Sequence, residues 1–152
     1  MLTSVLAGLE SWAPIAALRQ SAWAYPIASG CHVLALSVLF GTIAIVDLRL
    51  AGALRRLDRG AVVSGLVPVA LFAFAACVAI GLLLFAPAGR EYLANPYFPA
   101  KLVLIGLAGL NAIGLHTALA ARCSDVALRA FGLVSLGLWI MVVFTGRMLA
   151  FG

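Results

Sequence analysis

Four apolar segments, each about long enough to cross a lipid bilayer, constrain this 152-residue chain more than any other feature. The clearest covers residues 99–123, and an α-helix needs about 20 such residues to span the hydrocarbon core. Hydrophobic residues make up 65% of the chain and charged residues only 10%. A soluble domain has roughly a quarter charged residues, so this composition excludes a soluble fold. The sequence therefore predicts an all-α, multi-pass membrane protein.

The apolar segments predict four membrane-spanning helices in one domain that covers residues 23–152. Short connections between the helices favour an antiparallel four-helix bundle. Pro68 lies inside the second span and is expected to kink it and to free the carbonyl of Ser64. A loop at Pro87–Ala100 is expected to lead from the second span to the third. By hydropathy, the predicted bounds of the spans are about 25–46, 62–86, 100–121 and 130–151.

The first 22 residues form a separate and less apolar segment. Pro14 interrupts any long helix here, and Glu10 and Arg19 would be charged groups in lipid. Trp12 and Trp23 suit the headgroup layer, where such rings are enriched. We therefore expect a short interfacial helix that lies on the membrane. The segment has no basic start and no clear cleavage site, which argues against a signal peptide.

Basic residues are concentrated in two of the connections. The link that ends at Gly60 holds four arginines and the link before the fourth span holds two. The connection between the second and third spans holds only Arg90, with Lys101 at its border. Because positive loops stay in the cytoplasm, both chain ends are expected outside, which is the periplasm for spans in a bacterial inner membrane. This topology signal explains the net charge of +5 without nucleic-acid binding.

A few polar side chains inside the spans are the candidate functional residues, because polar groups in a bilayer usually face the protein interior. With about 1.5 Å of rise per residue, His32 lies roughly 5 Å to the outer side of its span centre. His116 lies roughly 7 Å to the inner side. Asn111 lies near the centre of its span and Lys101 at the outer boundary.

Sulfur-bearing residues fall near the level of His32. Cys77 of the second span and Met141 of the fourth lie within about one helical turn of that level. Imidazole, thiolate and thioether together suit Cu(I). The sequence therefore predicts a metal site of His32, Cys77 and Met141, with Cys31 as a further candidate ligand. A periplasmic-side position would let an incoming ion reach it without crossing the apolar core.

A b-type haem is the alternative cofactor, because His32 and His116 could each supply an axial imidazole. The two ligands of an upright haem need nearly equal depth, and these histidines differ by roughly 12 Å. One bis-histidine haem within one chain is therefore disfavoured, while two haems, or pairing across a homo-oligomer, stay open. A structural subunit of a larger membrane complex, without a cofactor, is the third alternative. No motif for hydrolytic or nucleophilic catalysis occurs in the sequence.

Two stretches resemble parts of the copper resistance protein D family. The run NPYFPAKLVLIGLAGLNA resembles a family stretch with a tyrosine, a lysine, an apolar run and an asparagine, and CHVLALSVLFGTIAIVDLRL resembles its histidine-bearing helix. Overall the chain is similar to a group of short four-helix bacterial membrane proteins, which are distantly similar to the copper resistance protein D family. The chain departs from the family pattern at Phe40, where the family tends to carry tryptophan. A fainter similarity to cytochrome b561-type bundles rests on helix number and histidines. The resemblance implies copper binding or transport, and the matching positions are His32, Gly41, Asp47, Tyr97, Lys101 and Asn111.

Reporter fusions test the predicted orientation. A fusion at Gly60 should be active with a cytoplasmic reporter, and a fusion at Gly152 with a periplasmic one, because the arginine-rich link is expected to stay in the cytoplasm. A periplasmic reporter that is active at Gly60 would overturn the orientation and the outer and inner assignments that depend on it.

Overall fold

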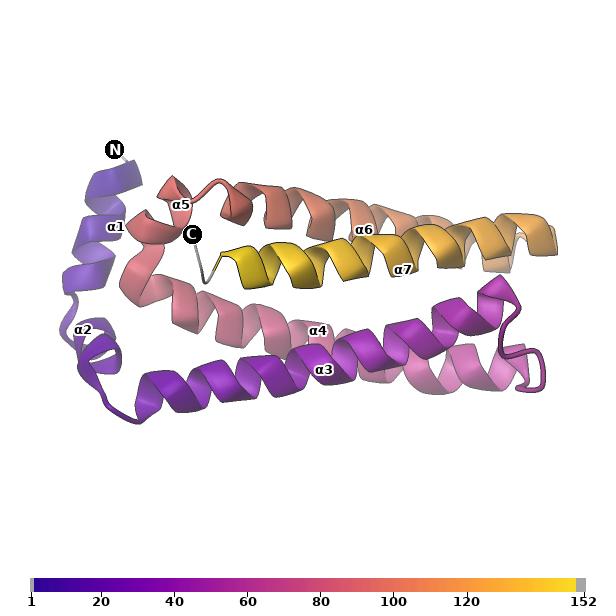
Figure 1. Cartoon of the computed structure of the whole chain (residues 1–152), viewed down its shortest axis with the longest axis horizontal. Helices are drawn as coiled ribbons and strands as arrows, with labels where there is room; N and C mark the ends of the chain where they lie inside the picture. Colours follow the sequence, from indigo (N-terminus) through magenta and orange to yellow (C-terminus); the bar gives the residue numbers. More distant parts are fainter. Residues whose placement is uncertain (1, 150–152) are drawn as a thin grey trace.

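The computed structural model describes residues 2–149 and is helical over most of that range (Figure 1). The four predicted spans are confirmed as the long helices α3 (Ala24–Ala51), α4 (Arg59–Phe85), α6 (Tyr97–Ala120) and α7 (Asp125–Met148). Each is long and apolar enough to cross a membrane. Their bounds differ from the predicted ones by up to five residues, chiefly because the helices continue past the apolar runs into polar residues. α4 runs through Pro68 without interruption.

Local chemistry fixes where the spans begin and end. Asp58 caps α4 by accepting the backbone N–H of Ala61 at 2.7 Å. Ser124 caps α7 in the same way, with the N–H of Ala127 at 3.4 Å. α3 ends at Ala51 and is capped by Gly52, whose φ of 93° is in the left-handed region that favours glycine.

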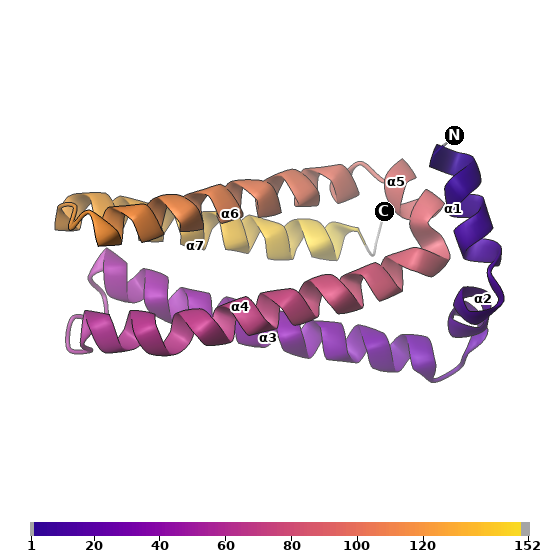
Figure 2. The same cartoon turned by 180° about the vertical axis from the view of Figure 1, so that it is seen from behind.

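The four long helices form an antiparallel bundle. α3 packs chiefly against α4, and α6 against α7, while the crossing of α3 with α7 joins the two pairs. Figure 2 shows α4 and α6 from the other side, with α4 in front of α3 and α6 in front of α7. All four helices contribute to one buried cluster, which contains Leu39, Ala73, Cys77, Ala108, Trp139 and Val142. A second cluster, toward the arginine-rich end, contains Val46, Leu50, Ala118 and Leu128.

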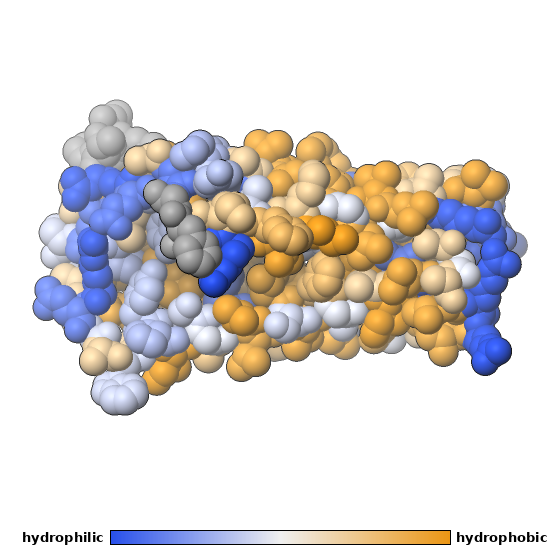
Figure 3. Space-filling model, viewed as in Figure 1, coloured by the Kyte–Doolittle hydropathy of each residue, from blue (hydrophilic) through white to orange (hydrophobic). Residues whose placement is uncertain are grey.

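The lateral surface of the bundle is apolar. Figure 3 shows a hydrophobic belt with hydrophilic residues gathered at the two ends. The side chains of Leu34, Phe72, Leu110 and Phe144 are between 63% and 79% exposed. Soluble proteins rarely expose such continuous apolar surface. A lipid bilayer is therefore the environment that this surface fits.

Two short helices lie across one end of the bundle, called here the outer end. They are α1 (Leu2–Ser11) and α2 (Ala13–Gln20), and they contact η1 (Ala86–Ala88) and α5 (Gly89–Ala94) (Figure 1). The single interfacial helix expected from the sequence is thus a pair, because Pro14 starts a new helix. The expected loop after the second span is also corrected: it is mostly helical, formed by η1, α5 and the start of α6.

Ion pairs attach this helix pair to the bundle. Arg90 Nε donates to Glu10 Oε2 at 2.8 Å, and the Arg90 backbone N–H donates to Glu10 Oε1 at 3.0 Å. These bonds, led by the one from the backbone, hold the pKa of Glu10 below its usual value. Arg19 pairs with Glu91 at 2.8 Å. The charges that would be unfavourable in lipid therefore find partners at the end of the bundle.

The backbones of α3 and α7 approach very closely at Gly132. A Cβ atom at this position would lie 2.9 Å from the carbonyl oxygen of Asp47 and 3.1 Å from the Cβ of Leu50. No larger residue fits without a shift of one helix. Glycine at this site is what permits the close contact that helices in membranes use for association.

Substituting Gly132 tests this crossing. Gly132→Ala should lower the free energy of unfolding in detergent by about 1–3 kcal/mol, the usual range for overpacking a tight contact. Gly137→Ala on the same helix is the matched control, because a Cβ there meets nothing within 4 Å. Equal thermal denaturation midpoints for Gly132→Ala and the wild-type protein would contradict the close crossing.

Candidate functional site

Polar side chains from three helices gather in the outer half of the bundle. The imidazole of His32 on α3 lies against the backbone carbonyl of Cys77 on α4. The ammonium group of Lys101 on α6 is close enough to act electrostatically on both side chains. We call His32, Cys77 and Lys101 the outer polar cluster.

Two glycines make room for this cluster. A Cβ at Gly81 on α4 would lie 3.3 Å from Cε1 and 3.9 Å from Nδ1 of His32. A Cβ at Gly146 on α7 would lie 3.4 Å from Nζ of Lys101. The imidazole and the ammonium group therefore occupy the space that larger residues would fill at these positions.

One ring nitrogen of His32 has no hydrogen-bond partner. Its Nδ1 atom is buried and receives no bond from any group in the described part of the chain. Burying a polar atom without a partner is unfavourable by about 1–3 kcal/mol. Such an atom is available as a ligand, because a neutral imidazole nitrogen carries a lone pair. Cys77, which is 8% exposed, supplies a sulfur in the same region.

The other predicted ligands do not face this region. Met141 lies on the outward side of α7 with 46% of its side chain exposed, next to the buried Val142. Cys31 is exposed as well, whereas its neighbour His32 is half-buried. Of the proposed ligands, only Cys77 is buried, and the half-buried His32 lies against its backbone carbonyl. Over the residues it describes, the structure holds no group of three or more His, Cys, Asp or Glu side chains arranged to bind a metal ion.

The inner-half candidates on α6 are separate from the outer polar cluster. His116 is exposed on the lateral surface and lies about 22 Å along α6 from Lys101. Because Lys101 is close to His32, the two histidines are far apart along the bundle. Asn111 has a structural role, since its Nδ2 donates to the backbone carbonyl of Phe131 on α7 at 3.1 Å.

A buried carboxyl group was not among the predicted site residues, although the sequence analysis named it as a position of the family resemblance. Asp47 on α3 is 2% exposed and faces Ser135 on α7, which is 8% exposed. Its Oδ2 atom has no hydrogen-bond partner among the described residues. The sequence analysis placed Asp47 at the boundary of the first span, but α3 continues to Ala51 and buries it. Gly132 and Ser135, one turn apart on α7, were the available signal for a close crossing at this level.

No protein-family model, curated protein or solved structure matches the chain. The class of the protein therefore rests on its fold alone. Four long apolar helices with an apolar lateral surface define a multi-pass membrane protein with a helical bundle.

Thiol labelling tests the burial of Cys77. A variant that keeps only Cys77 (Cys31→Ser, Cys123→Ser) should resist a water-soluble maleimide until it is denatured, because the side chain is enclosed by the bundle. A variant that keeps only Cys123 should react in the native state, since this residue is exposed in the link before α7. Mass spectrometry counts the adducts, and fast native labelling of Cys77 would contradict its position.

Proposed function

We propose that this membrane protein binds a soft redox metal, most simply Cu(I), through His32 and Cys77 in the outer half of its bundle. The single observation that carries the proposal is the buried Nδ1 atom of His32, which has no hydrogen-bond partner among the described residues, on an imidazole that lies against the backbone of Cys77. Imidazole and thiolate are ligands that Cu(I) accepts. The resemblance to the copper resistance protein D family supports the same ion.

The charge of Lys101 limits which ion fits. An ammonium group within a low-dielectric bundle repels a cation strongly. A thiolate bound to Cu(I) carries no net charge, so Lys101 is compatible with that pair. A divalent ion on the same two ligands would leave a net positive charge beside Lys101. The cluster therefore favours a monovalent soft ion over Zn²⁺ or Mg²⁺.

The proposal extends to the membrane and to partners. For spans in a bacterial inner membrane, arginine counting favours an outer end that faces the periplasm. The outer polar cluster would then be reached from the periplasmic side. The exposed apolar faces also leave room for a second copy of the chain or for another membrane subunit.

A b-type haem remains the competing cofactor, and the placement of the histidines weighs against its simplest form. Two axial ligands must reach one iron, whereas His116 is exposed and about 22 Å along the bundle from the outer polar cluster. Haem binding by this chain would therefore need a ligand from a second subunit or a second type of ligand.

Metal content of purified variants tests the proposal. After loading with Cu(I) under reducing conditions, the wild-type protein should hold an equimolar amount of copper and show no Soret band. His32→Ala and Cys77→Ser should each lose most of it, because each removes one ligand. Cys123→Ser and Met141→Leu are the controls and should keep it.

Two results would reject the copper site. The first is equal copper in wild type and His32→Ala, and the second is a wild type that purifies with haem and no copper.

Lys101→Met tests the charge argument separately. It should keep copper binding and allow Zn²⁺ to bind as well, whereas unchanged exclusion of Zn²⁺ would show that Lys101 does not select the ion.

A further inference from the structure

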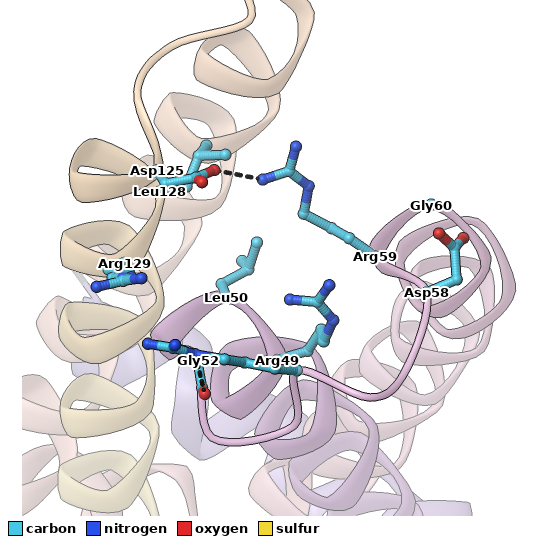
Figure 4. A pocket seen from close by; sticks show the side chains of 10 residues that line it. Arg49, Leu50, Gly52, Asp58, Arg59, Gly60, Asp125, Leu128 and Arg129 are labelled. Atoms are coloured by element: carbon cyan, nitrogen blue, oxygen red, sulfur yellow. Dashed lines mark hydrogen bonds and ion pairs between the residues drawn. The ribbon is translucent and has the colours of Figure 1, made fainter.

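An open pocket of about 710 Å³ lies at the inner end of the bundle, opposite α1 and α2. It lies between α3, α4 and α7 and the link that joins α3 to α4 (Figure 4). Its volume is within the usual range for small-molecule sites, about 300–1,000 Å³. The residues that line it are Arg49, Leu50, Gly52, Arg55, Asp58, Arg59, Gly60, Asp125, Leu128 and Arg129.

Positive charge dominates this pocket. Four of its lining residues are arginines and two are aspartates. Both carboxylates already have partners: Asp58 accepts the N–H of Ala61, and Asp125 accepts from Arg59 Nη1 at 2.8 Å. The lining residues therefore carry four positive charges against two negative ones.

The other three guanidinium groups keep donors available. Arg49 donates through Nε to the carbonyl of Leu57 at 2.5 Å, and Arg55 through Nε to that of Gly52 at 3.0 Å. These bonds tether the side chains and leave the terminal nitrogens without a protein acceptor over the described residues. Arg129 makes no side-chain hydrogen bond there, and a Cβ at Gly52 would lie 3.2 Å from Nε of Arg55 and 3.8 Å from Nε of Arg129. Two cationic groups therefore lie close to the same glycine.

An anion bound between these like charges would offset their mutual repulsion. Guanidinium groups bind phosphate oxygens in a bidentate manner, which makes arginine the preferred partner of phosphate groups. Helix dipoles add a smaller positive contribution, because the N-termini of α4 and α7 lie at the pocket and the C-terminus of α3 offsets only one of them. The arginines are the main source of the positive potential.

The surroundings of the pocket favour a lipid as the source of the phosphate. Leu50 and Leu128, which line it, belong to the buried apolar cluster of the inner half. Apolar side chains nearby face outward, with Val126 74% and Leu57 45% exposed. A molecule with a phosphate head and apolar chains matches both properties. Basic pockets between transmembrane helices on the cytoplasmic side bind the headgroups of anionic lipids.

We propose that this arginine pocket binds the phosphate of an anionic phospholipid headgroup in the inner leaflet. Arg49, Arg55 and Arg129 supply the phosphate donors, and the lipid chains extend along the apolar surface beside the pocket. A free soluble phosphate has the same headgroup chemistry but no chains, so the two sources are separable by experiment.

Native mass spectrometry of the detergent-solubilised full chain tests the proposal. Phosphatidylglycerol should bind in a saturable manner and more tightly than phosphatidylcholine. Inorganic phosphate at about 1 mM should not displace it, because the acyl chains add affinity. Arg129→Gln should weaken phosphatidylglycerol binding about fivefold, and Arg55→Gln with Arg129→Gln about 25-fold, for roughly 1 kcal/mol per arginine. Arg56→Gln is the matched control, since this neighbouring arginine does not line the pocket.

Each alternative outcome overturns a stated part of the proposal. Wild-type affinity for phosphatidylglycerol in the double variant, or an equal loss in Arg56→Gln, would reject the pocket as the site. Displacement of the lipid by inorganic phosphate, with the same dependence on Arg129, would assign the pocket to a soluble phosphate instead. If the double variant does not fold, Arg129→Gln alone decides, because the exposed side chain of Arg129 makes no hydrogen bond to any residue that the structure describes.

Discussion

In a bilayer, apolar side chains are as well solvated by lipid as by each other, so hydrophobicity alone cannot decide which helix faces meet. Small residues and a few polar contacts make that decision here. Gly132 lets α7 reach the backbone of α3 beside Asp47, and Ser135 faces the Asp47 carboxyl one turn further on. On the other side of α7, Asn111 of α6 donates to the carbonyl of Phe131. These contacts place α7 between α3 and α6 and so hold the two helix pairs together.

The outer polar cluster follows from the same principle. Gly81 and Gly146 leave the space that His32 and Lys101 occupy, so two groups that lipid would solvate poorly are placed inside the bundle. The cost of burying them is only partly offset, because Nδ1 of His32 has no partner in the described chain. A bound metal ion would supply that partner.

The two ends of the molecule also differ: carboxylates pair with arginines at the outer end, whereas arginines outnumber their acidic partners at the inner end.

The number and approximate extent of the spans could be predicted from the sequence, because the length of an apolar run is tied to the thickness of the membrane. The common level of His32 and Cys77 also followed from counting residues, since depth depends only on helical rise. Rotation about each helix axis cannot be counted in that way, and Met141, which was assigned to the same level, faces outward. Asp47 was missed as a buried residue because hydropathy ended the first span too early. The arginines of the pocket were interpreted only as a topology signal, since the pocket that they line forms only where α3, α4 and α7 converge.

The central claim is the proposal that the imidazole of His32 and the thiolate of Cys77 are the ligands of a soft metal ion inside the membrane bundle. X-ray absorption at the copper K-edge tests it most directly, because the spectrum identifies the atoms bound to the metal. The account predicts that the Cu(I)-loaded wild-type protein has both nitrogen and sulfur neighbours, and that Cys77→Ser removes the sulfur from the spectrum of any copper that remains. A spectrum with nitrogen and oxygen neighbours only, or one unchanged by Cys77→Ser, would contradict it.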